Sequence, residues 1–176
     1  MLAPKGYTQH ISKEAYIAAR TIASSKNGVL RYRMPLVCLA AAMLLGGAKT
    51  VYQGGNIGYY MTGIILMLLG AVCALMALYV LPKQVGIAAE RDYVTFSVLS
   101  DPANVTFESD DMCFQTDKLT RRVEYAKTRL CIETRARFVV LTDDGAMVIL
   151  EKDCFEDNDA TLAFLRDVFA RWYKRG

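Results

Sequence analysis

The sequence has little of the chemistry that enzymes and metal sites use. His10 is the single histidine, and it has no cysteine or carboxylate partner at ligand spacing, so we expect an exposed or strand-edge side chain. A nucleophile paired with histidine would have to recruit this residue from across a long apolar segment. No glycine-rich loop follows a strand and opens a helix, as a phosphate-binding loop does. We therefore predict no enzyme activity, no cofactor and no metal.

The cysteines also lack a functional pattern. Cys38 and Cys73 lie in apolar segments, whereas Cys113, Cys131 and Cys154 are scattered singly. No pair has the spacing of a metal or redox motif, and an odd number of cysteines is a poor disulfide framework. We expect all five to be small buried hydrophobic residues in a cytoplasmic protein.

Charge is almost absent from the stretch between Met34 and Pro82, where Lys49 is the only charged residue. Two apolar segments fill it, residues 34–51 with 18 residues and residues 57–81 with 25. A membrane-spanning helix needs about 20 apolar residues, so we predict a transmembrane hairpin over residues 34–82. A cleaved signal peptide is the competing interpretation of the first segment. The long region before it and the second segment directly after it disfavour cleavage.

Basic residues flank the apolar segments on one side. Six bases stand against Glu14 within residues 1–33, and Lys83 and Arg91 follow the second segment. The positive-inside rule then places both termini in the cytoplasm and the turn outside, in a multi-pass protein of the cell (inner) membrane. A net charge of +3 argues against nucleic acid as the main partner.

Small residues recur along both apolar segments and indicate how the helices pack. They are Cys38, Ala42 and Gly46 in the first segment, and Gly63, Gly70, Ala74 and Ala77 in the second. Such residues let membrane helices approach closely. Either the two spans pack against each other through these faces, or two copies pair as a homodimer. Neither span has an ionisable residue in its interior, which favours an anchor over a transport path.

The region before the first span, residues 1–33, predicts a short strand and a helix. Residues 7–11 suit a strand, and Ser12 is a suitable N-cap for a helix over residues 13–25. Asn27-Gly28 would end that helix. The helix lies either along the membrane surface or on the cytoplasmic domain, and its weak amphipathicity leaves both open.

Residues 83–176 predict a cytoplasmic α+β domain. Alternating apolar residues indicate strands at residues 93–99, 105–107, 112–114, 119–125, 129–133, 137–141 and 146–151. Asp143-Asp144-Gly145 is the strongest hairpin turn in the chain. An amphipathic helix begins near Asn158 and must cover an open face or end of the sheet.

Lys118, Arg121 and Arg122 open a run of seven bases within residues 118–137. Strand alternation could turn several of them to one side, where they would contact anionic lipid or a protein partner. The alternative is a solvated sheet face in which Glu124 and Glu133 are cross-strand partners of the bases.

Short motifs occur in a fixed order along almost the whole chain. They are Tyr7-Thr8, Lys13-Glu14-Ala15-Tyr16, Val105-Thr106-Phe107-Glu108, Val123-Glu124-Tyr125, Ile132-Glu133-Thr134, Phe138-Val139-Val140-Leu141 and Ile149 to Phe155. In this order the chain resembles the YcxB-like family of bacterial membrane proteins, although Glu151 stands where the family usually has proline. The resemblance implies a pleckstrin-homology-like domain, a strongly bent antiparallel sheet capped by the C-terminal helix. It implies no catalytic residues.

These observations predict a non-enzymatic interaction module anchored in the membrane. Its cytoplasmic domain would dock a protein partner or anionic lipid. The alternative is a regulatory or assembly subunit that acts through its transmembrane helices.

Overall fold

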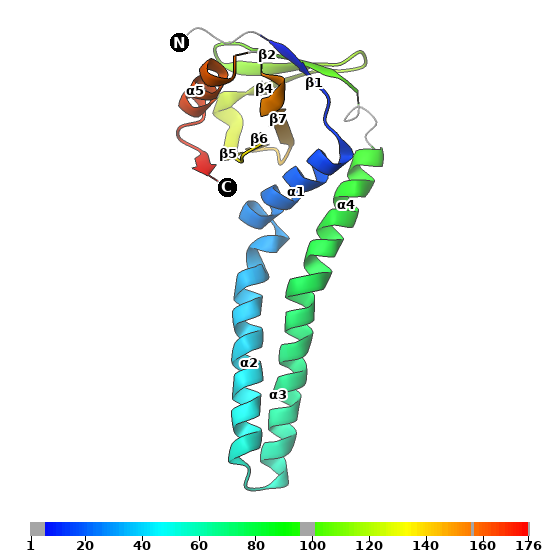
Figure 1. Ribbon diagram of the computed structural model, residues 1–176, viewed down its shortest axis with the longest axis vertical. Coiled ribbons are helices and arrows are strands. Elements are labelled where there is room, and N and C mark those ends of the chain that lie inside the picture. The colour runs from blue at the N-terminus through cyan, green and yellow to red at the C-terminus, as the bar shows by residue number, and fades with distance from the viewer. Residues whose placement is uncertain (1–5, 96–100, 156, 176) are drawn as a thin grey trace. The chain divides into compact units, whose positions relative to one another are not determined.

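The chain divides into two compact units in the computed structural model, which describes residues 6–95, 101–155 and 157–175 (Figure 1). The helical unit is Ser24–Ile87. The strand unit combines the residues up to Ala23 with those from Ala88 onward. The fold class is therefore α+β with two long apolar helices, as predicted.

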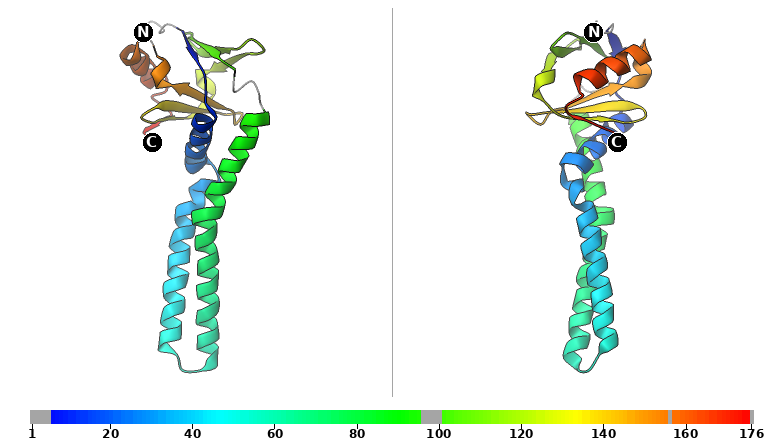
Figure 2. Two further views of the ribbon diagram at one scale, coloured as in Figure 1. Left: turned by 45° about the vertical axis from the view of Figure 1, so that its right-hand side comes forward. Right: turned by 90° about the vertical axis from the view of Figure 1, so that its left-hand side faces the viewer.

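The helical unit is an antiparallel hairpin of α2 (Arg33–Gln53) and α3 (Ile57–Leu75) (Figures 1 and 2). A short 3₁₀ helix, η1 (Val29–Tyr32), precedes α2. Asn56 caps α3, because its side chain accepts hydrogen bonds from the N–H groups of Gly58 and Tyr59. The helical stretches Val29–Gln53 and Ile57–Thr95 are both long and apolar enough to cross a membrane.

Pro82 neither ends the second long helix nor interrupts it. The π-helical turn η2 (Met76–Val80) links α3 to α4 (Leu81–Thr95), so the helix runs on past the proline. A proline removes an N–H donor and crowds the carbonyl four residues earlier, here Leu78. The wider π turn contains that residue and accommodates the proline. The strand predicted over residues 93–99 is wrong for residues 93–95, which are helical, and residues 96–99 lie outside the described residues.

The hairpin packs through small residues spaced seven apart. Gly63, Gly70 and Ala77 are buried on the second helix, and a Cβ added at Gly63 would lie 2.8 Å from the carbonyl oxygen of Gly47. At Gly70 an added Cβ would lie 3.0 Å from the carbonyl oxygen of Ala40. Three of the four small residues expected on the second helix, Gly63, Gly70 and Ala77, are thus buried, and Ala74 is half-buried.

On α2 the contact lies on a different side from the expected one. Cys38 and Ala42 are exposed, and a Cβ on Gly46 would meet no atom within 4 Å. At about 100° per residue, Cys38, Ala42 and Gly46 lie roughly opposite Ala40 and Gly47. A seven-residue repeat drifts by only about 20°, so it keeps facing a partner helix better than a four-residue repeat does.

The strands form two four-stranded sheets, whereas the family resemblance implied one strongly bent sheet. The first sheet has the order β1 (Tyr7–Gln9), β2 (Ala103–Phe107), β3 (Asp111–Gln115) and β4 (Thr120–Glu124). The second has the order β7 (Met147–Glu151), β6 (Arg137–Thr142), β5 (Thr128–Glu133) and β8 (Tyr173–Arg175). The 3₁₀ turn η4 (Tyr125–Lys127) carries the chain from one sheet to the other. All pairings are antiparallel except that of β5 with β8.

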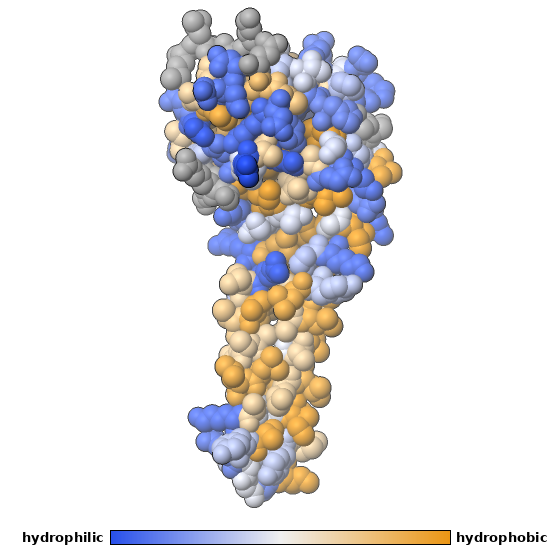
Figure 3. Space-filling model, in the orientation of Figure 1, coloured by the Kyte–Doolittle hydropathy of each residue, from blue (hydrophilic) through white to orange (hydrophobic). Residues whose placement is uncertain are grey.

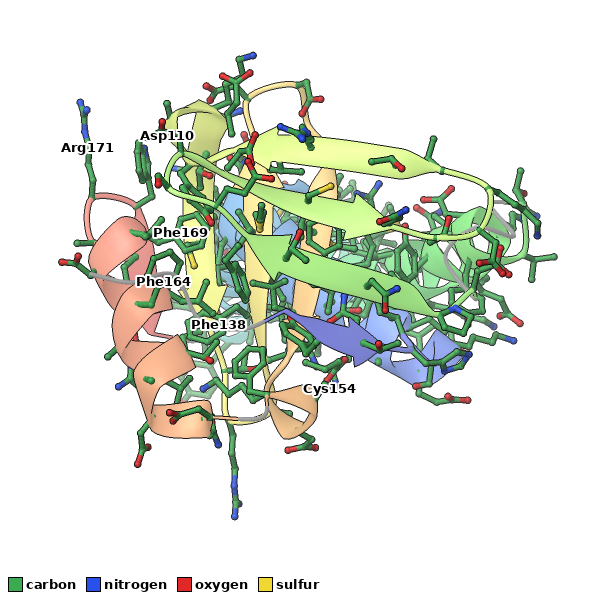
Figure 4. All side chains as sticks on the ribbon, turned by 90° about the horizontal axis from the view of Figure 1, so that it is seen from above. Asp110, Phe138, Cys154, Phe164, Phe169 and Arg171 are labelled. Atoms are coloured by element: carbon green, nitrogen blue, oxygen red, sulfur yellow. The ribbon has the colours of Figure 1, made fainter. Side chains whose placement is uncertain are left out.

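The main core lies between the two sheets and under α5 (Asn158–Val168). Asp157 caps this helix by accepting a hydrogen bond from the N–H of Ala160. Phe164 and Phe169 point from the C-terminal segment toward the strands (Figure 4). The ring of Phe169 meets that of Tyr125 edge-on, with centroids 5.6 Å apart.

The opposite face of the second sheet is covered by α1 (Lys13–Asn27). Ser12 caps α1 as predicted, because its hydroxyl accepts a hydrogen bond from the N–H of Ala15. Tyr16 and Ala19 pack with Ile132 and Val139 in a second buried cluster. Of the two placements left open for this helix, the structure has the one on the strand domain.

Candidate functional site

The three predicted contact bases do not form one basic face. β4 is an edge strand, and Arg121 and Arg122 are neighbours on it, so their side chains point to opposite faces. Arg121 lies opposite the core residue Phe114 and therefore shares the inner face, whereas Arg122 lies opposite Cys113.

Each of these bases lies close to a carboxylate. The ammonium of Lys118 is 2.9 Å from Asp101. The guanidinium of Arg122 is 3.7 Å from Glu108 and from Asp111. Arg121 has the longest separation, 3.9 Å to Oδ2 of Asp144. Interleaved charges of both signs produce little net field beyond about 10 Å.

Glu124 and Glu133, the expected cross-strand acids, have different surroundings. Glu124 accepts a 2.6 Å hydrogen bond from exposed Lys127. Glu133 is only 7% exposed, and its partners come from elsewhere in the chain. Lys152 lies 2.6 Å away, and Arg166 of α5 makes two hydrogen bonds of 3.0 and 2.7 Å.

A buried ionic cluster thus surrounds Glu133, and the Tyr173 hydroxyl also donates to it. Hydrogen bonds from Arg166, Lys152 and Tyr173 hold the pKa of Glu133 at about 2, against an ordinary 4.5. The cluster ties α5, β8 and the turn after β7 to β5. Sequence reasoning missed it, because its members come together only when the C-terminal helix folds back.

A second feature that the sequence did not reveal is a cavity beside β7. The cavity has a volume of about 130 Å³, and its apolar lining includes Ile11, Phe114, Leu119, Met147 and Ile149. Arg121 also lines this cavity. These residues come from four separate stretches of the chain, so no local pattern could have indicated them.

Gln9 closes one end of the β7 edge. Its buried side-chain amide donates to the carbonyl oxygen of Ile149 at 2.8 Å and accepts from the N–H of Glu151 at 3.2 Å. The side chain therefore occupies the place of a neighbouring strand over these two residues. The rest of the edge, toward Met147, borders the cavity.

His10 and the cysteines lie apart from these features. His10 is exposed, and the described part of the chain holds no group of three or more metal-ligating side chains. Cys131 is buried, and this burial raises the pKa of its thiol to about 12. The expectation that all cysteines are buried is met by Cys131 alone. Cys73, Cys113 and Cys154 are half-buried, and Cys38 is exposed on the side of α2 away from the contact face.

The surface of the hairpin is apolar over most of its length, and hydrophilic residues gather at its turn (Figure 3). Large apolar side chains such as Ile64, Leu68 and Val72 are about half exposed or more. Within the apolar 18-residue stretch of each long helix, only 11% of the residues are buried. The core helix of a soluble protein would be mostly buried.

Known proteins do not assign a function to the ionic cluster or to the cavity. Comparison of the chain with protein-family models, with curated proteins and with solved structures finds no match.

Proposed function

We propose that this chain is a membrane-anchored interaction module without enzyme activity. Its hairpin spans a bacterial inner membrane, both termini lie in the cytoplasm, and the strand unit docks a protein partner. The apolar surface of the hairpin is the observation that carries this proposal.

The hairpin has the dimensions that a bilayer requires. A helix of 25 residues, the length of Val29–Gln53, extends about 37 Å at 1.5 Å per residue, enough to cross about 30 Å of hydrocarbon. Exposed tyrosines, including Tyr52, Tyr59 and Tyr60, gather near the turn, where aromatic side chains prefer the membrane interface. A cleaved signal sequence would account for the first helix alone.

The strand unit supports a pleckstrin-homology-like, YcxB-like assignment in its element order. Seven consecutive strands divide between two sheets, and a C-terminal helix packs on the core that they enclose. The short strand β8 is additional to this order of seven strands and a helix. The resemblance itself supplies no activity.

A protein partner fits the surface better than anionic lipid does. Lipid head groups attract clusters of basic residues on one face. Arg121 and Arg122 point to opposite faces, and Lys118 lies against Asp101. The surface therefore lacks a uniform basic patch around these residues.

Cell fractionation tests the anchor. The full chain is expected in the membrane pellet after an alkaline carbonate wash, and only detergent should release it, because the apolar surface of its helices is mostly exposed among the described residues. A phosphatase reporter inserted after Gly55 should be active outside the cytoplasm. A green fluorescent reporter at the C-terminus should fluoresce inside. Recovery of the chain in the carbonate supernatant would refute the anchor, and reversed reporter signals would refute its orientation.

The second candidate function is a regulatory or assembly subunit that acts through its helices. The open face of Cys38, Ala42 and Gly46 favours it, since this face is turned away from α3 and leaves room for another helix.

This candidate predicts that Ala42→Leu with Gly46→Leu abolishes co-purification of a partner from native membranes, because leucine side chains would hold the helices apart. Ala41→Leu with Ala48→Leu is the matched control, since both alanines are exposed but lie on a neighbouring side of α2, outside that face. Equal yields of partner from both double variants would reject a helix-mediated role.

A further inference from the structure

The edge of β7 that faces away from β6 is unpaired over half its length, where Met147 is half-buried and Ile149 is 3% exposed. β7 pairs only with β6 in its sheet. The bonds of Gln9 to Ile149 and Glu151 show that the odd-numbered residues of β7 direct their main-chain groups away from β6. The N–H and C=O of Met147 and the N–H of Ile149 therefore face outward. No strand within the described residues pairs with them.

Such an edge is a template for another strand. Unpaired N–H and C=O groups in a row attract extended chains, and proteins commonly cover or blunt them. Here Gln9 pairs with the half near Glu151 and leaves the half near Met147 unpaired. The unpaired half is the one beside the apolar cavity, through which a ligand would reach it.

The cavity has the size of one apolar side chain. Its volume is about 130 Å³, and a dry cavity of about 150 Å³ takes up a molecule as large as benzene. Phe114, Leu119 and Ile149 contribute an apolar lining. A valine, leucine or isoleucine side chain suits such a space.

Arg121 supplies a positive charge at the same cavity. Among the described residues its guanidinium makes no hydrogen bond, and the 3.9 Å to Asp144 is too long for one. Asp144 instead uses its other carboxylate oxygen to accept from Thr142 and from the N–H of Ala146. Asp101, which also lines the cavity, pairs with Lys118. A carboxylate is the group that an arginine fork binds best.

We propose that the open edge of β7 binds an extended segment of a partner protein as an added strand. One apolar side chain of the segment fills the cavity, and an acidic side chain meets Arg121. Main-chain hydrogen bonds to Met147 and Ile149 supply affinity, and the two side-chain sites supply specificity. The inference rests on the proposed interaction function and adds the docking edge and the chemistry of the partner.

A peptide selection tests the site without knowledge of the partner. The full chain in nanodiscs of zwitterionic lipid is offered a phage library of random peptides of about seven residues, the length of a strand. The enriched peptides should combine an apolar residue with Asp or Glu at a fixed even spacing, because alternate side chains share a face. Arg121→Gln should remove the preference for the acidic residue.

Main-chain pairing is tested on the strongest synthetic peptide. In a paired strand, alternate amides of the peptide point toward β7. N-methylation of these amides should weaken binding by about tenfold or more, whereas N-methylation of the other alternate set should be tolerated. This measurement needs no change in the protein. Met147→Pro, which removes an edge N–H, should weaken binding similarly.

Thr120→Pro is the matched control for that variant. Leu119 and Tyr125 bond to the β3 side of β4, so the N–H of Thr120 points to the free edge of β4. This variant should bind the peptide normally.

Three outcomes would overturn the inference. If the selection enriches no peptide, the proposed peptide site is wrong, even if the membrane anchor is verified. If binding survives N-methylation of both alternate sets of amides and also survives Met147→Pro, the protein still docks a peptide, but not along this edge of β7. An empty selection with binding to phosphatidylglycerol vesicles that Arg121→Gln abolishes assigns Arg121 to lipid instead.

Discussion

Glu133→Gln is expected to destabilise the strand unit by about 3–5 kcal/mol, the usual cost of removing one partner from a buried ion pair. The substitution leaves Lys152, whose side chain is 11% exposed, without its carboxylate. It also releases Arg166 of α5 and Tyr173 of β8. Urea unfolding of the full chain in mild detergent, followed by the fluorescence of the single tryptophan Trp172, measures the loss.

Glu124→Gln is the matched control for this substitution. Glu124 and Lys127 are more than half exposed, and exposed pairs contribute only about 0–1 kcal/mol. Equal losses in the two variants would show that the cluster around Glu133 does not stabilise the fold.

The same carboxylate predicts a dependence of stability on pH. The pKa of Glu133 is lowered from 4.5 to about 2, so its stabilisation is complete above pH 4.5 and disappears as the pH falls toward 2. A shift of this size corresponds to about 3 kcal/mol. Glu133→Gln should lack this component of the acid dependence. Parallel stability–pH curves for the variant and the wild type would contradict the assignment.

Gly63→Leu is expected to force the hairpin apart. A Cβ at Gly63 would lie 2.8 Å from the carbonyl oxygen of Gly47 and 2.5 Å from Cγ2 of Val51. A backbone oxygen cannot rotate away, so the helices must separate, at a cost of about 1–3 kcal/mol or more. The apparent melting temperature of the purified chain in mild detergent should fall.

Gly46→Leu provides the control for the hairpin, since a Cβ at Gly46 would meet no atom within 4 Å. Its melting temperature should stay near that of the wild type. A larger fall for Gly46→Leu than for Gly63→Leu would show that the contact face of α2 is wrongly assigned.

Local signals in the sequence predicted the features that depend on near neighbours. Ser12 caps α1 through an N–H only three residues away. Gly145 has a φ of 81°, which glycine adopts without strain, and the turn it closes joins β6 to β7 as predicted. The two apolar segments became helices because their length and composition permit little else.

The contact face of α2 shows where such signals fail. The small residues Cys38, Ala42 and Gly46 and the small residues Ala40 and Gly47 are both present in one helix. Choosing between the two faces requires the partner helix, with Gly63 and Gly70 as the matching surface.

The extent of the strand unit also depended on distant partners. The sequence suggested that the residues after the hairpin form the domain, yet β1 pairs with β2 and α1 covers the second sheet. Short strands such as β1 and β8, of three residues each, have too few positions for an alternating pattern to be distinctive.

The sequence by itself therefore determined the α+β class, the two apolar helices and the caps and turns, since each of these reflects interactions between residues close together in the chain. Only the tertiary structure decided which strands share a sheet, which carboxylate is buried among cations and where an edge remains open. Glu133 meets Arg166, and Gln9 meets Ile149, across separations of 33 and 140 residues. Contacts of that range leave no periodic trace in the sequence.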